Sequence, residues 1–187
     1  SSHFSTLPAR PPFLVIFSHS AGHNQLDIAY QEYPTHAMFV IGEAALFLRG
    51  FDQNARLSGI SVASGDQLTL RREPDNRHDR HAVRAESKNG RLVGHAAKEY
   101  AAECSSVIER AVANPISYIT IVHGTEDEYC HLGGYRFFST KVNITMIFFS
   151  TSSPSQLQIQ EMKRIADDCN VIDITCVATD DQLATTN

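Results

Sequence analysis

The sequence predicts a mainly β fold of the α+β class: a small β-barrel with one or two helices, followed by a C-terminal helix–strand appendage. The stretch from Leu68 to Ala101 reads as three short strands (LTLR, AVRAE and RLVGH) and the start of a helix. Tight turns rich in Pro, Asp, Asn and Gly separate these strands. Beyond Ser150 the pattern changes to loop, helix and strand, which an antiparallel barrel does not need.

The N-terminal part is expected to supply the opening strands. Residues 1–12 contain three prolines and predict an unstructured lead, and FLVIFS at Phe13–Ser18 predicts a buried strand. The polar region His19–Thr35 reads as a loop, in which LDIAYQEY could form a short helix. The apolar run Ala37–Leu48 predicts one or two strands with a break near Gly42.

Two polar segments connect this run to the central strands. Phe51–Leu57 is polar and predicts a loop. Ser58–Val62 and Gln67–Arg71 predict a β-hairpin across ASGD, which is a favourable turn sequence.

Periodicity predicts the elements that follow the central strands. Lys98–Val112 has apolar residues at three- and four-residue steps and predicts a helix, which Asn114 and Pro115 end. Ile116–Val122 alternates and predicts a strand. We then expect an acidic loop at Gly124–Gly134 and two further strands, at Tyr135–Ser139 and Val142–Phe149.

The tail predicts a helix that starts near Pro154 and a strand at Val171–Val177. The apolar face of this helix is expected to contain Leu157, Met162, Ile165 and Cys169, with Ile159 less well placed. Together with Val142–Phe149, the tail predicts two parallel paired strands joined by a crossover helix. We therefore divide the chain into an N-terminal extension (1–36), a barrel (37–150) and an appendage (151–187), and expect truncation after Ser150 to leave a soluble domain.

The charge distribution predicts a localised anion-binding site. The net charge is −5, but Leu48–Lys98 contains ten Lys and Arg against six Asp and Glu, which gives +4 and leaves −9 for the rest of the chain. A single basic segment within an acidic chain favours a confined site over a broad cationic surface.

Several function classes are disfavoured because their sequence patterns are missing. The apolar runs are shorter than the ~18 residues that span a bilayer, so no membrane partner is expected. The four cysteines include no C-x-x-C pair, which disfavours a disulfide framework and a zinc site and fits a reducing compartment. No G-x-x-x-x-G-K-[ST] loop, G-x-S-x-G elbow or H-E-x-x-H motif occurs. We therefore expect a binding module without catalytic residues or cofactor, with any ATPase, helicase or nuclease activity outside this chain.

The central motif resembles the signature of the HIRAN domain family. That signature runs R-[ED]-P-x-N-x-x-D-x-x-A-[IV]-x-V, then a turn, V-G-[HY] and a helix; this chain has LRREPDNRHDRHAVRA and RLVGHAAKEYA. Leu48-Arg49-Gly50 fits the family's entry strand, and the resemblance covers about Ala37–Ser150. It implies an OB-like barrel, a shape often used for single strands, that clamps the free 3′-hydroxyl end of single-stranded DNA.

The resemblance also implies five DNA-binding residues. The family's acidic residue, which receives the 3′-hydroxyl, falls on Asp79; a carboxylate accepts from a hydroxyl and repels a 3′-phosphate. His78 stands at a base-stacking tyrosine position. His95 and Lys98 stand at phosphate-contacting positions, with Lys98 at a helix N-terminus. Arg56 matches the family's loop arginine and is expected to cluster with His95 and Lys98.

The chain departs from the family pattern directly after Arg56. Two base-sandwiching tyrosines of the family are Leu57 and Ser58 here. Losing stacks worth ~1–3 kcal/mol per base would weaken DNA binding by orders of magnitude. Phe51 or Tyr100 could compensate for this loss.

Several residues of the motif could instead have a purely structural role. Glu73, Pro74 and Asn76 are more readily explained as turn architecture than as ligand contacts. Asp79 could cap the turn or pair with a neighbouring arginine. His95 could be a packed barrel histidine, and His81 is expected to be structural.

Together these observations predict a single-stranded DNA-binding module for free 3′-hydroxyl ends. It would direct an attached or partner SNF2-type ATPase, helicase or nuclease in DNA repair or fork remodelling, in the nucleus of a eukaryote or otherwise in the cytoplasm. One alternative is a degenerate HIRAN domain that acts as a protein-interaction module, favoured by the acidic segment Thr125–Tyr129 and the acidic flanks. The second is a metal-dependent hydrolase or nuclease that uses His78, Asp79 and His81.

Overall fold

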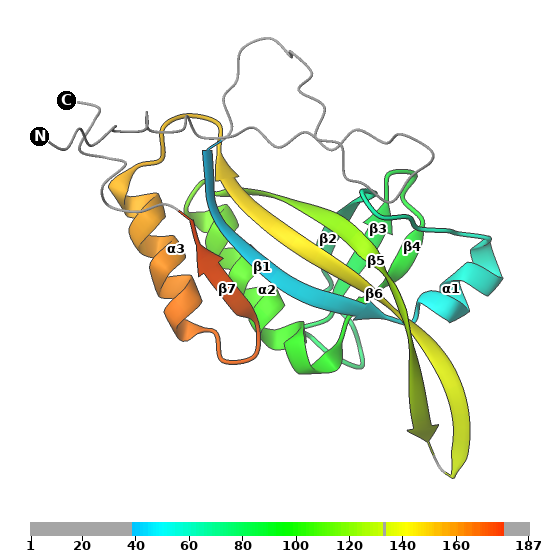
Figure 1. Ribbon diagram of the computed structural model, residues 1–187. Coiled ribbons are helices and arrows are strands. Elements are labelled where there is room, and N and C mark those ends of the chain that lie inside the picture. The colour runs from blue at the N-terminus through cyan, green and yellow to red at the C-terminus, as the bar shows by residue number, and fades with distance from the viewer. Residues whose placement is uncertain (1–38, 133, 178–187) are drawn as a thin grey trace, which may run out of the picture.

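The computed structural model describes residues 39–132 and 134–177, so the expected strand at Phe13–Ser18 and the loop after it lie outside the described residues. Three helices and seven strands make up the described part (Figure 1). In chain order they are β1 (Phe39–Arg49), α1 (Phe51–Ser58), β2 (Gln67–Arg72), β3 (Val83–Ser87), β4 (Leu92–Ala96), α2 (Lys98–Ala113), β5 (Ser117–Leu132), β6 (Tyr135–Ser150), α3 (Gln156–Asp168) and β7 (Asp173–Cys176). None of the described helices is long and apolar enough to cross a membrane.

The strands β1 to β6 form a closed barrel. The order along the sheet is β4-β3-β2-β5-β6-β1-β7, and a second pairing joins β4 to β1. This closing contact is short, since its register contains only Leu48 opposite Ala96 and Arg49 opposite His95. The predicted mainly β barrel is confirmed, and β7 extends the sheet beyond it.

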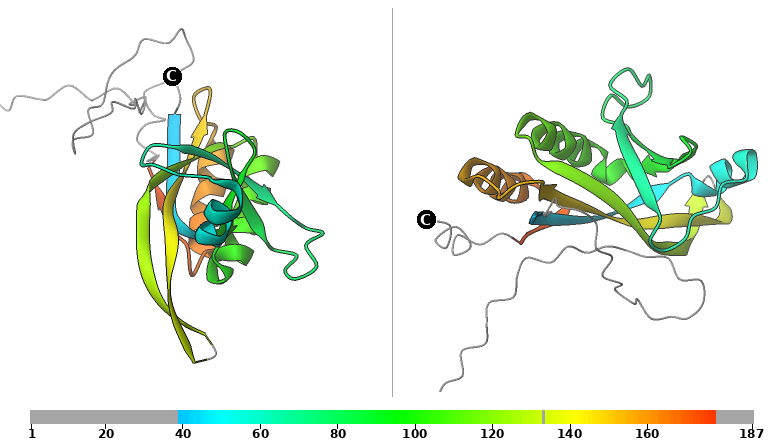
Figure 2. Two further views of the ribbon diagram at one scale, coloured as in Figure 1. Left: turned by 90° about the vertical axis from the view of Figure 1, so that its right-hand side faces the viewer. Right: turned by 90° about the horizontal axis from the view of Figure 1, so that it is seen from above.

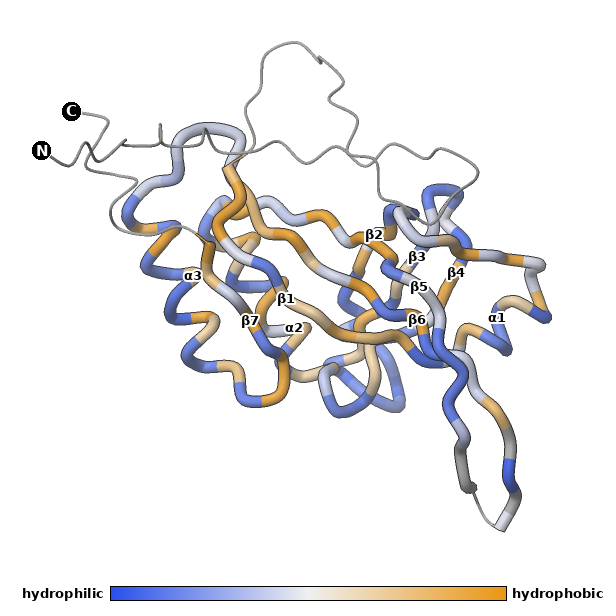
Figure 3. The backbone as a smooth tube through the Cα atoms, viewed as in Figure 1, coloured by the Kyte–Doolittle hydropathy of each residue, from blue (hydrophilic) through white to orange (hydrophobic). Residues whose placement is uncertain are grey.

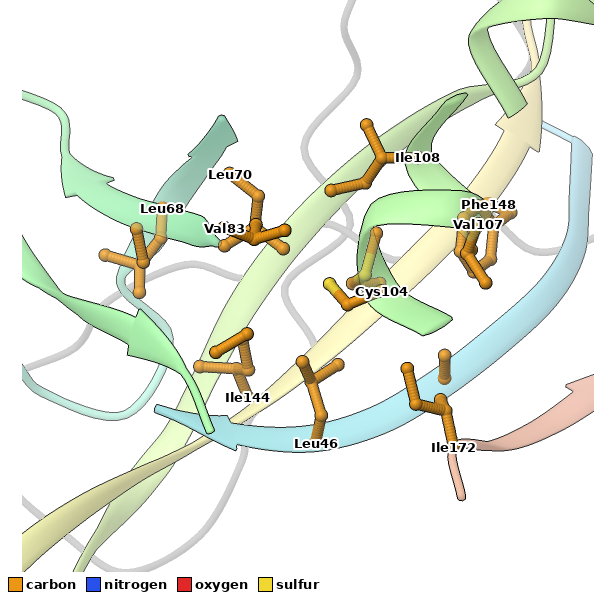
Figure 4. Packing of buried hydrophobic residues seen from close by; sticks show 14 of the residues in the cluster. Leu46, Leu68, Leu70, Val83, Cys104, Val107, Ile108, Ile144, Phe148 and Ile172 are labelled. Carbon is orange, nitrogen blue, oxygen red and sulfur yellow. The ribbon is translucent and has the colours of Figure 1, made fainter. Parts of the chain in front are cut away.

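The core lies inside the barrel and beneath two helices. Alternate residues of β1 and β6, such as Leu46 and Ile144, point inward, and Cys104, Val107 and Ile108 of α2 pack against them (Figure 4). Each large side chain buried in this way contributes about 1.5–3 kcal/mol to the free energy of unfolding. Figure 3 shows the matching sequence pattern, with hydrophobic residues along β1 and β6 and hydrophilic ones along the projecting part of β5.

The predicted loop at 51–57 is wrong, because this segment forms α1. Its apolar residues Phe51 and Ala55, four positions apart, pack against the core and stabilise a helical turn that polarity alone does not predict. Glycines in the left-handed conformation end it on both sides, Gly50 at φ 83° and Gly59 at φ 62°. The predicted strand at 58–62 is also wrong, because Ser58 is the last residue of α1 and residues 59–62 form no strand.

The predicted acidic loop at 124–134 is wrong as well, since this region belongs to the long β5–β6 hairpin that extends from the barrel (Figure 1). The two strands expected at 135–149 are one continuous strand. Partners outside β5 accommodate its carboxylates: Glu126 pairs with Lys141 at 3.3 Å, and Glu128 pairs with Arg49 at 2.7 Å. Such cross-strand pairs outweigh the low strand propensity of acidic residues.

The tail forms the predicted helix and strand, but their packing differs from the prediction. Ile159, Met162 and Ile165 are the buried residues of α3, whereas Leu157 is 73% exposed. The strand β7 pairs with β1 in an antiparallel sense, from Gly42 opposite Cys176 to Ala45 opposite Asp173. Consequently β6 and β7 run parallel but do not pair directly, because β1 lies between them.

This arrangement follows from the free edge of β1. Since β4 pairs only with the last residues of β1, the earlier part of the same edge is available to β7. A side chain at Gly42 would place its Cβ 3.0 Å from Met162 Cγ, so glycine allows α3 to approach β1 closely. The buried residues of α3 and Ile172 belong to the same hydrophobic cluster as the barrel interior.

Candidate functional site

A cleft of about 620 Å³ opens between the 73–82 turn, the end of β4 and the start of α2. Four of the five predicted site residues, His78, Asp79, His95 and Lys98, line this cleft together. Its other lining residues are Asn76, His81, Ala82, Ala96, Ala101 and Ala102. Arg56 is not among them; it lies exposed on α1, where its Nε donates to the Asp52 carbonyl oxygen at 3.3 Å.

The turn is organised by Asn76, as its predicted structural role requires. Its side-chain oxygen accepts hydrogen bonds from the backbone amides of His78 (3.0 Å) and Asp79 (3.2 Å). Its amide nitrogen donates to Oε2 of Glu73 at 3.1 Å. One side chain therefore satisfies two backbone donors of the turn and fixes the positions of the two residues that line the cleft.

The two carboxylate oxygens of Asp79 differ in their contacts. Oδ1 accepts from the backbone amide of His81 at 2.8 Å, which is the turn-capping role considered from the sequence. Among the described residues, neither Arg77 nor Arg80 forms an ion pair with it, and Oδ2 has no hydrogen-bond partner. Because a carboxylate oxygen is a hydrogen-bond acceptor, Oδ2 of this half-buried group is free to accept a hydrogen bond from a ligand.

His95 is held by Glu73, which also pairs with Arg84. Its Nε2 lies 3.1 Å from Oε2 of Glu73, and Oε1 of Glu73 lies 3.4 Å from Nη1 of Arg84. The imidazole is 39% exposed, so it is not the fully packed barrel histidine considered as an alternative. With Nε2 occupied, Nδ1 remains for a contact in the cleft.

Gly94 explains why the motif needs glycine before this histidine. A Cβ at position 94 would lie 2.5 Å from the backbone oxygen of Arg49, closer than real Cβ contacts allow. The bare backbone lets β4 approach β1 and close the barrel. The same approach places His95 beside Arg49.

Lys98 is the first residue of α2 and has no ion-pair partner in the described part of the chain. The unpaired amides at a helix N-terminus favour an anion, and the ammonium group adds to that field. The small side chains of Ala101 and Ala102 keep the cleft open beside it. This end of the cleft therefore suits a phosphate.

The sequence pattern did not predict a row of basic residues that crosses four strands. The strand register places Arg71, Arg84, His95 and Arg49 opposite one another on β2, β3, β4 and β1. Acidic residues neutralise the row: Glu86 lies 2.9 Å from Arg71 and 3.1 Å from Arg84. The alternation within each strand is visible in the sequence, but the register between strands is not.

The ion pairs show which positive charges of the basic segment remain available. Arg49, Arg71, Arg72 and Arg84 are paired with glutamates. Six others make no ion pair with a described residue: Arg56, Arg77, Arg80, Lys88, Arg91 and Lys98. Lys98 lines the cleft, and Arg77 and Arg80 are sequence neighbours of residues that line it, so part of the unpaired charge belongs to this region.

The residues of the metal hypothesis do not form a ligand set. Nε2 of His81 accepts a hydrogen bond from Nε of Arg80 at 3.0 Å, and Oδ1 of Asp79 is used by the turn. Within residues 39–132 and 134–177, no group of three His, Cys, Asp or Glu residues is arranged to hold a metal ion.

Comparison with known proteins identifies the family of this domain. The chain is similar to the crystal structure of the HIRAN domain of human HLTF, with 16% identity, a TM-score of 0.49 and coverage of 70% of this chain and 91% of that one. It is also similar to the NMR structure of the HLTF HIRAN domain in its DNA-bound conformation, with 18% identity, a TM-score of 0.40 and coverage of 69% of this chain and 92% of that one. A third similar structure is that of a protein from Lactobacillus plantarum, with 14% identity, a TM-score of 0.39 and coverage of 59% of this chain and 98% of that one. No curated protein matches the sequence. The model of the HIRAN domain family matches residues 48–147, more than half of the 187 residues and including the whole 73–98 motif, so this chain belongs to the HIRAN domain family.

Proposed function

We propose that this domain binds single-stranded DNA and recognises a free 3′-hydroxyl end. The observation that carries the proposal is Asp79, whose Oδ1 is held by the turn while Oδ2 is free in a cleft shared with His78, His95 and Lys98. A terminal hydroxyl can donate to this carboxylate, whereas a 3′-phosphate would place like charges together. Hydrogen bonds to charged groups contribute about 1.5–3 kcal/mol, which corresponds to roughly 10- to 100-fold discrimination.

The rest of the cleft supports a nucleotide ligand. Lys98 and His95 are placed to contact phosphate, and His78 can stack on a base. Family membership supports DNA as the partner, and a HIRAN domain of human HLTF has a DNA-bound conformation. In this role the domain is a binding module that directs an SNF2-type ATPase or a nuclease, in cis or in trans, to DNA ends in repair or at replication forks. Its place of action is the nucleus in a eukaryote and the cytoplasm otherwise.

The test is a fluorescence anisotropy titration with matched oligonucleotides that end in 3′-hydroxyl or 3′-phosphate. The wild-type domain should prefer the hydroxyl by about 10-fold or more. Asp79→Asn should lose most of this preference and keep the residual affinity for internal DNA. Asp75→Asn is the matched control, because Asp75 is exposed in the same turn and does not line the cleft. Equal wild-type affinity for the two ends would refute end recognition.

The protein-interaction alternative keeps one specific observation in its favour. Phe138 is 72% exposed on the projecting hairpin, and its ring lies 5.2 Å from that of Tyr129. Exposed aromatic side chains are enriched at protein interfaces. A Phe138→Ala variant that keeps full DNA affinity but no longer captures a partner would assign this surface to protein binding.

A further inference from the structure

Glu73 connects the separate segments that border the cleft. Its Oε2 atom accepts a hydrogen bond from the side-chain amide of Asn76 at 3.1 Å and lies 3.1 Å from Nε2 of His95 on β4. Its Oε1 atom lies 3.4 Å from Nη1 of Arg84 on β3. Figure 2 shows the 73–82 turn as a loop that projects beyond the ends of β2 and β3. The carboxylate therefore fixes this projecting turn to β3 and β4.

The contact with Glu73 determines which nitrogen of His95 carries the proton in the neutral imidazole. An ionised carboxylate only accepts hydrogen bonds, so the nitrogen that faces it, Nε2, must be the donor. The other nitrogen, Nδ1, is then an acceptor, and it has no hydrogen-bond partner among the described residues. Neutral His95 thus offers a lone pair, and not a proton, to a ligand in the cleft.

A phosphate oxygen cannot form a hydrogen bond with this lone pair. Phosphate oxygens are themselves acceptors, so the phosphate contact proposed for His95 requires a proton on Nδ1. Only the imidazolium form carries protons on both nitrogens. In that form Nε2 keeps its 3.1 Å contact with Glu73, which becomes an ion pair, while Nδ1 donates to the phosphate.

We propose that Glu73 is a positioning residue that makes the contact between His95 and a DNA phosphate depend on the uptake of one proton. This inference rests on the proposed function, since it concerns the phosphate beside the recognised end. The proton passes from solvent to Nδ1 when DNA binds and returns to solvent on dissociation. Because such coupling is reciprocal, DNA favours protonation by the same factor by which protonation favours DNA. The affinity for DNA therefore falls as the pH rises through the range in which imidazole groups titrate, about pH 5–8.

The charged groups around His95 leave this dependence in place. Arg84 and Arg49 lie opposite His95 in the strand register, but each is paired with a glutamate. Among side-chain types, only histidine ordinarily changes its charge between about pH 5 and pH 8, so single histidine variants isolate the contribution of His95. The titratable and charged groups that surround His95 come from four elements: Glu73, His78, Asp79 and His81 in the turn, Arg84 on β3, Arg49 on β1, and Lys98 and Glu99 on α2.

Long-range nitrogen–proton correlation spectra of the DNA-free protein give the tautomer of His95 directly. At about pH 8, where imidazole is ordinarily neutral, we expect a protonated Nε2 and an unprotonated Nδ1. A protonated Nδ1 in neutral His95 would overturn the proposal, because the imidazole could then donate to phosphate without taking up a proton. This measurement uses no DNA, so its result does not depend on the proposed function.

Anisotropy titrations with oligothymidylate that ends in a 3′-hydroxyl measure the proton uptake. This probe lacks a terminal phosphate monoester, which itself titrates near pH ~6. Affinity should fall by up to about tenfold per pH unit, and the salt slope should flatten by about 0.7 as one phosphate contact is lost. His95→Gln should abolish both effects, whereas His123→Gln, at an exposed position of β5 outside the cleft, should keep them. A pH dependence that persists in His95→Gln would refute the proposal.

Glu73→Gln separates positioning from a purely structural role in the turn. The uncharged amide does not stabilise the imidazolium, so at about pH 6 the variant should bind DNA roughly twofold to fivefold more weakly than the wild type, the effect of a partly exposed ion pair. At about pH 8, where imidazole is ordinarily neutral, the two proteins should bind alike. A loss of affinity that is equal at both pH values would leave Glu73 with a structural role only and overturn the proposal.

The end recognition and the proton uptake fail in different ways. A preference for the 3′-hydroxyl end together with pH-independent binding refutes only the proton uptake. Binding that depends on pH through His95 but shows no preference for the 3′-hydroxyl end refutes only the end recognition. An absence of DNA binding at every pH refutes both.

Discussion

Asn76 and Glu103 each stabilise a change of chain direction with one side chain. They differ in whether the polar groups around them keep free hydrogen-bonding capacity. Asn76 accepts hydrogen bonds from two backbone amides of the turn. Nearby, the side chains of His78 and Lys98 and the Oδ2 atom of Asp79 have no hydrogen-bond or ion-pair partner among the described residues. Glu103 accepts the amides of Asn170, Val171 and Ile172 between α3 and β7 at 2.8–3.1 Å, and both of its oxygens are used. The comparison suggests a criterion: a polar network that leaves free groups in a cleft is available to a ligand, whereas one that uses all of its groups only joins segments of the chain, and we call the Glu103 network the joint.

The strongest test of the joint is its removal. Truncation after Ser150 deletes four side chains that the barrel cluster buries: Ile159, Met162, Ile165 and Ile172. At about 1.5–3 kcal/mol each, their loss amounts to roughly 6–12 kcal/mol, comparable to the whole stability of a typical domain. In place of the soluble truncated domain expected from the sequence, we therefore predict loss of the cooperative thermal transition. Truncation after Val177 is the control and should melt like the full chain; a normal transition for the shorter form would restore the proposed boundary.

The turn should be disrupted by Asn76→Ala. This change removes three hydrogen bonds at once, so we expect a loss of about 2–3 kcal/mol in the free energy of unfolding. Affinity for 3′-hydroxyl DNA should also fall by about tenfold or more, because His78 and Asp79 lose their fixed positions. Denaturant titration and anisotropy measure the two effects. Asn89→Ala, in the exposed turn between β3 and β4, should change neither.

Glu103→Gln should have a smaller effect that depends on pH. Burial raises the pKa of Glu103, but hydrogen bonds from the Ile172, Asn170 and Val171 amides outweigh it and hold the pKa below its ordinary value of 4.5. The charged form therefore stabilises the fold fully above that ordinary value, and the contribution disappears as pH falls through the lowered pKa. At pH 7 the variant should lose about 1 kcal/mol.

Urea titrations from pH 7 to pH 3 measure this dependence. The difference between the wild type and Glu103→Gln should shrink on acidification. Glu109→Gln, on the same helix and exposed, should show a smaller difference at every pH. A difference that stays constant with pH would show that the Glu103 charge does not support the joint.

The smallest effect concerns Lys98. Replacing Lys98 with Gln should flatten the salt dependence of DNA binding by about one phosphate contact and weaken binding to all sequences alike. Lys88→Gln removes another exposed charge, outside the cleft, and should leave the slope unchanged. Equal slopes for the two variants would remove Lys98 from the interface.

Local sequence signals predicted those parts of the fold that local interactions determine. The strands β2 to β4 follow from their turn residues and α2 follows from its apolar period, and the structure confirms them within one or two residues. The strand predicted at Ile116–Val122 is confirmed as the first half of β5, whereas the loops predicted at 51–57 and 124–134 were wrong because polar residues there are paired with distant partners. One such partner pair is Asp52 and Thr140, where the Thr140 amide donates to Oδ2 of Asp52 at 2.6 Å.

In the candidate site, too, the sequence located the residues that are close in the chain but not those whose positions depend on tertiary packing. The family motif located the four cleft residues because they lie close together in sequence, on one turn, one strand end and one helix start. It did not place Arg56, whose position depends on how α1 packs. Neither the row of basic residues that ends at Arg49 nor the structural role of Glu103 could be inferred, since strand register decides the first and tertiary contact the second.

The position of β1 between β6 and β7 has a consequence for how the protein is made. β1 is the first described strand to leave the ribosome. Apart from the short contact with β4, its partners are synthesised 94 to 111 residues later on the β6 edge and 128 to 134 residues later on the β7 edge. At the usual 5–20 residues per second, translation leaves the apolar side chains of β1 without their final partners for roughly five seconds or longer. The barrel therefore cannot close until β6 has been synthesised, and the high sequence separation of these pairings predicts slow folding. During that interval the nascent strand is the segment most in need of a chaperone.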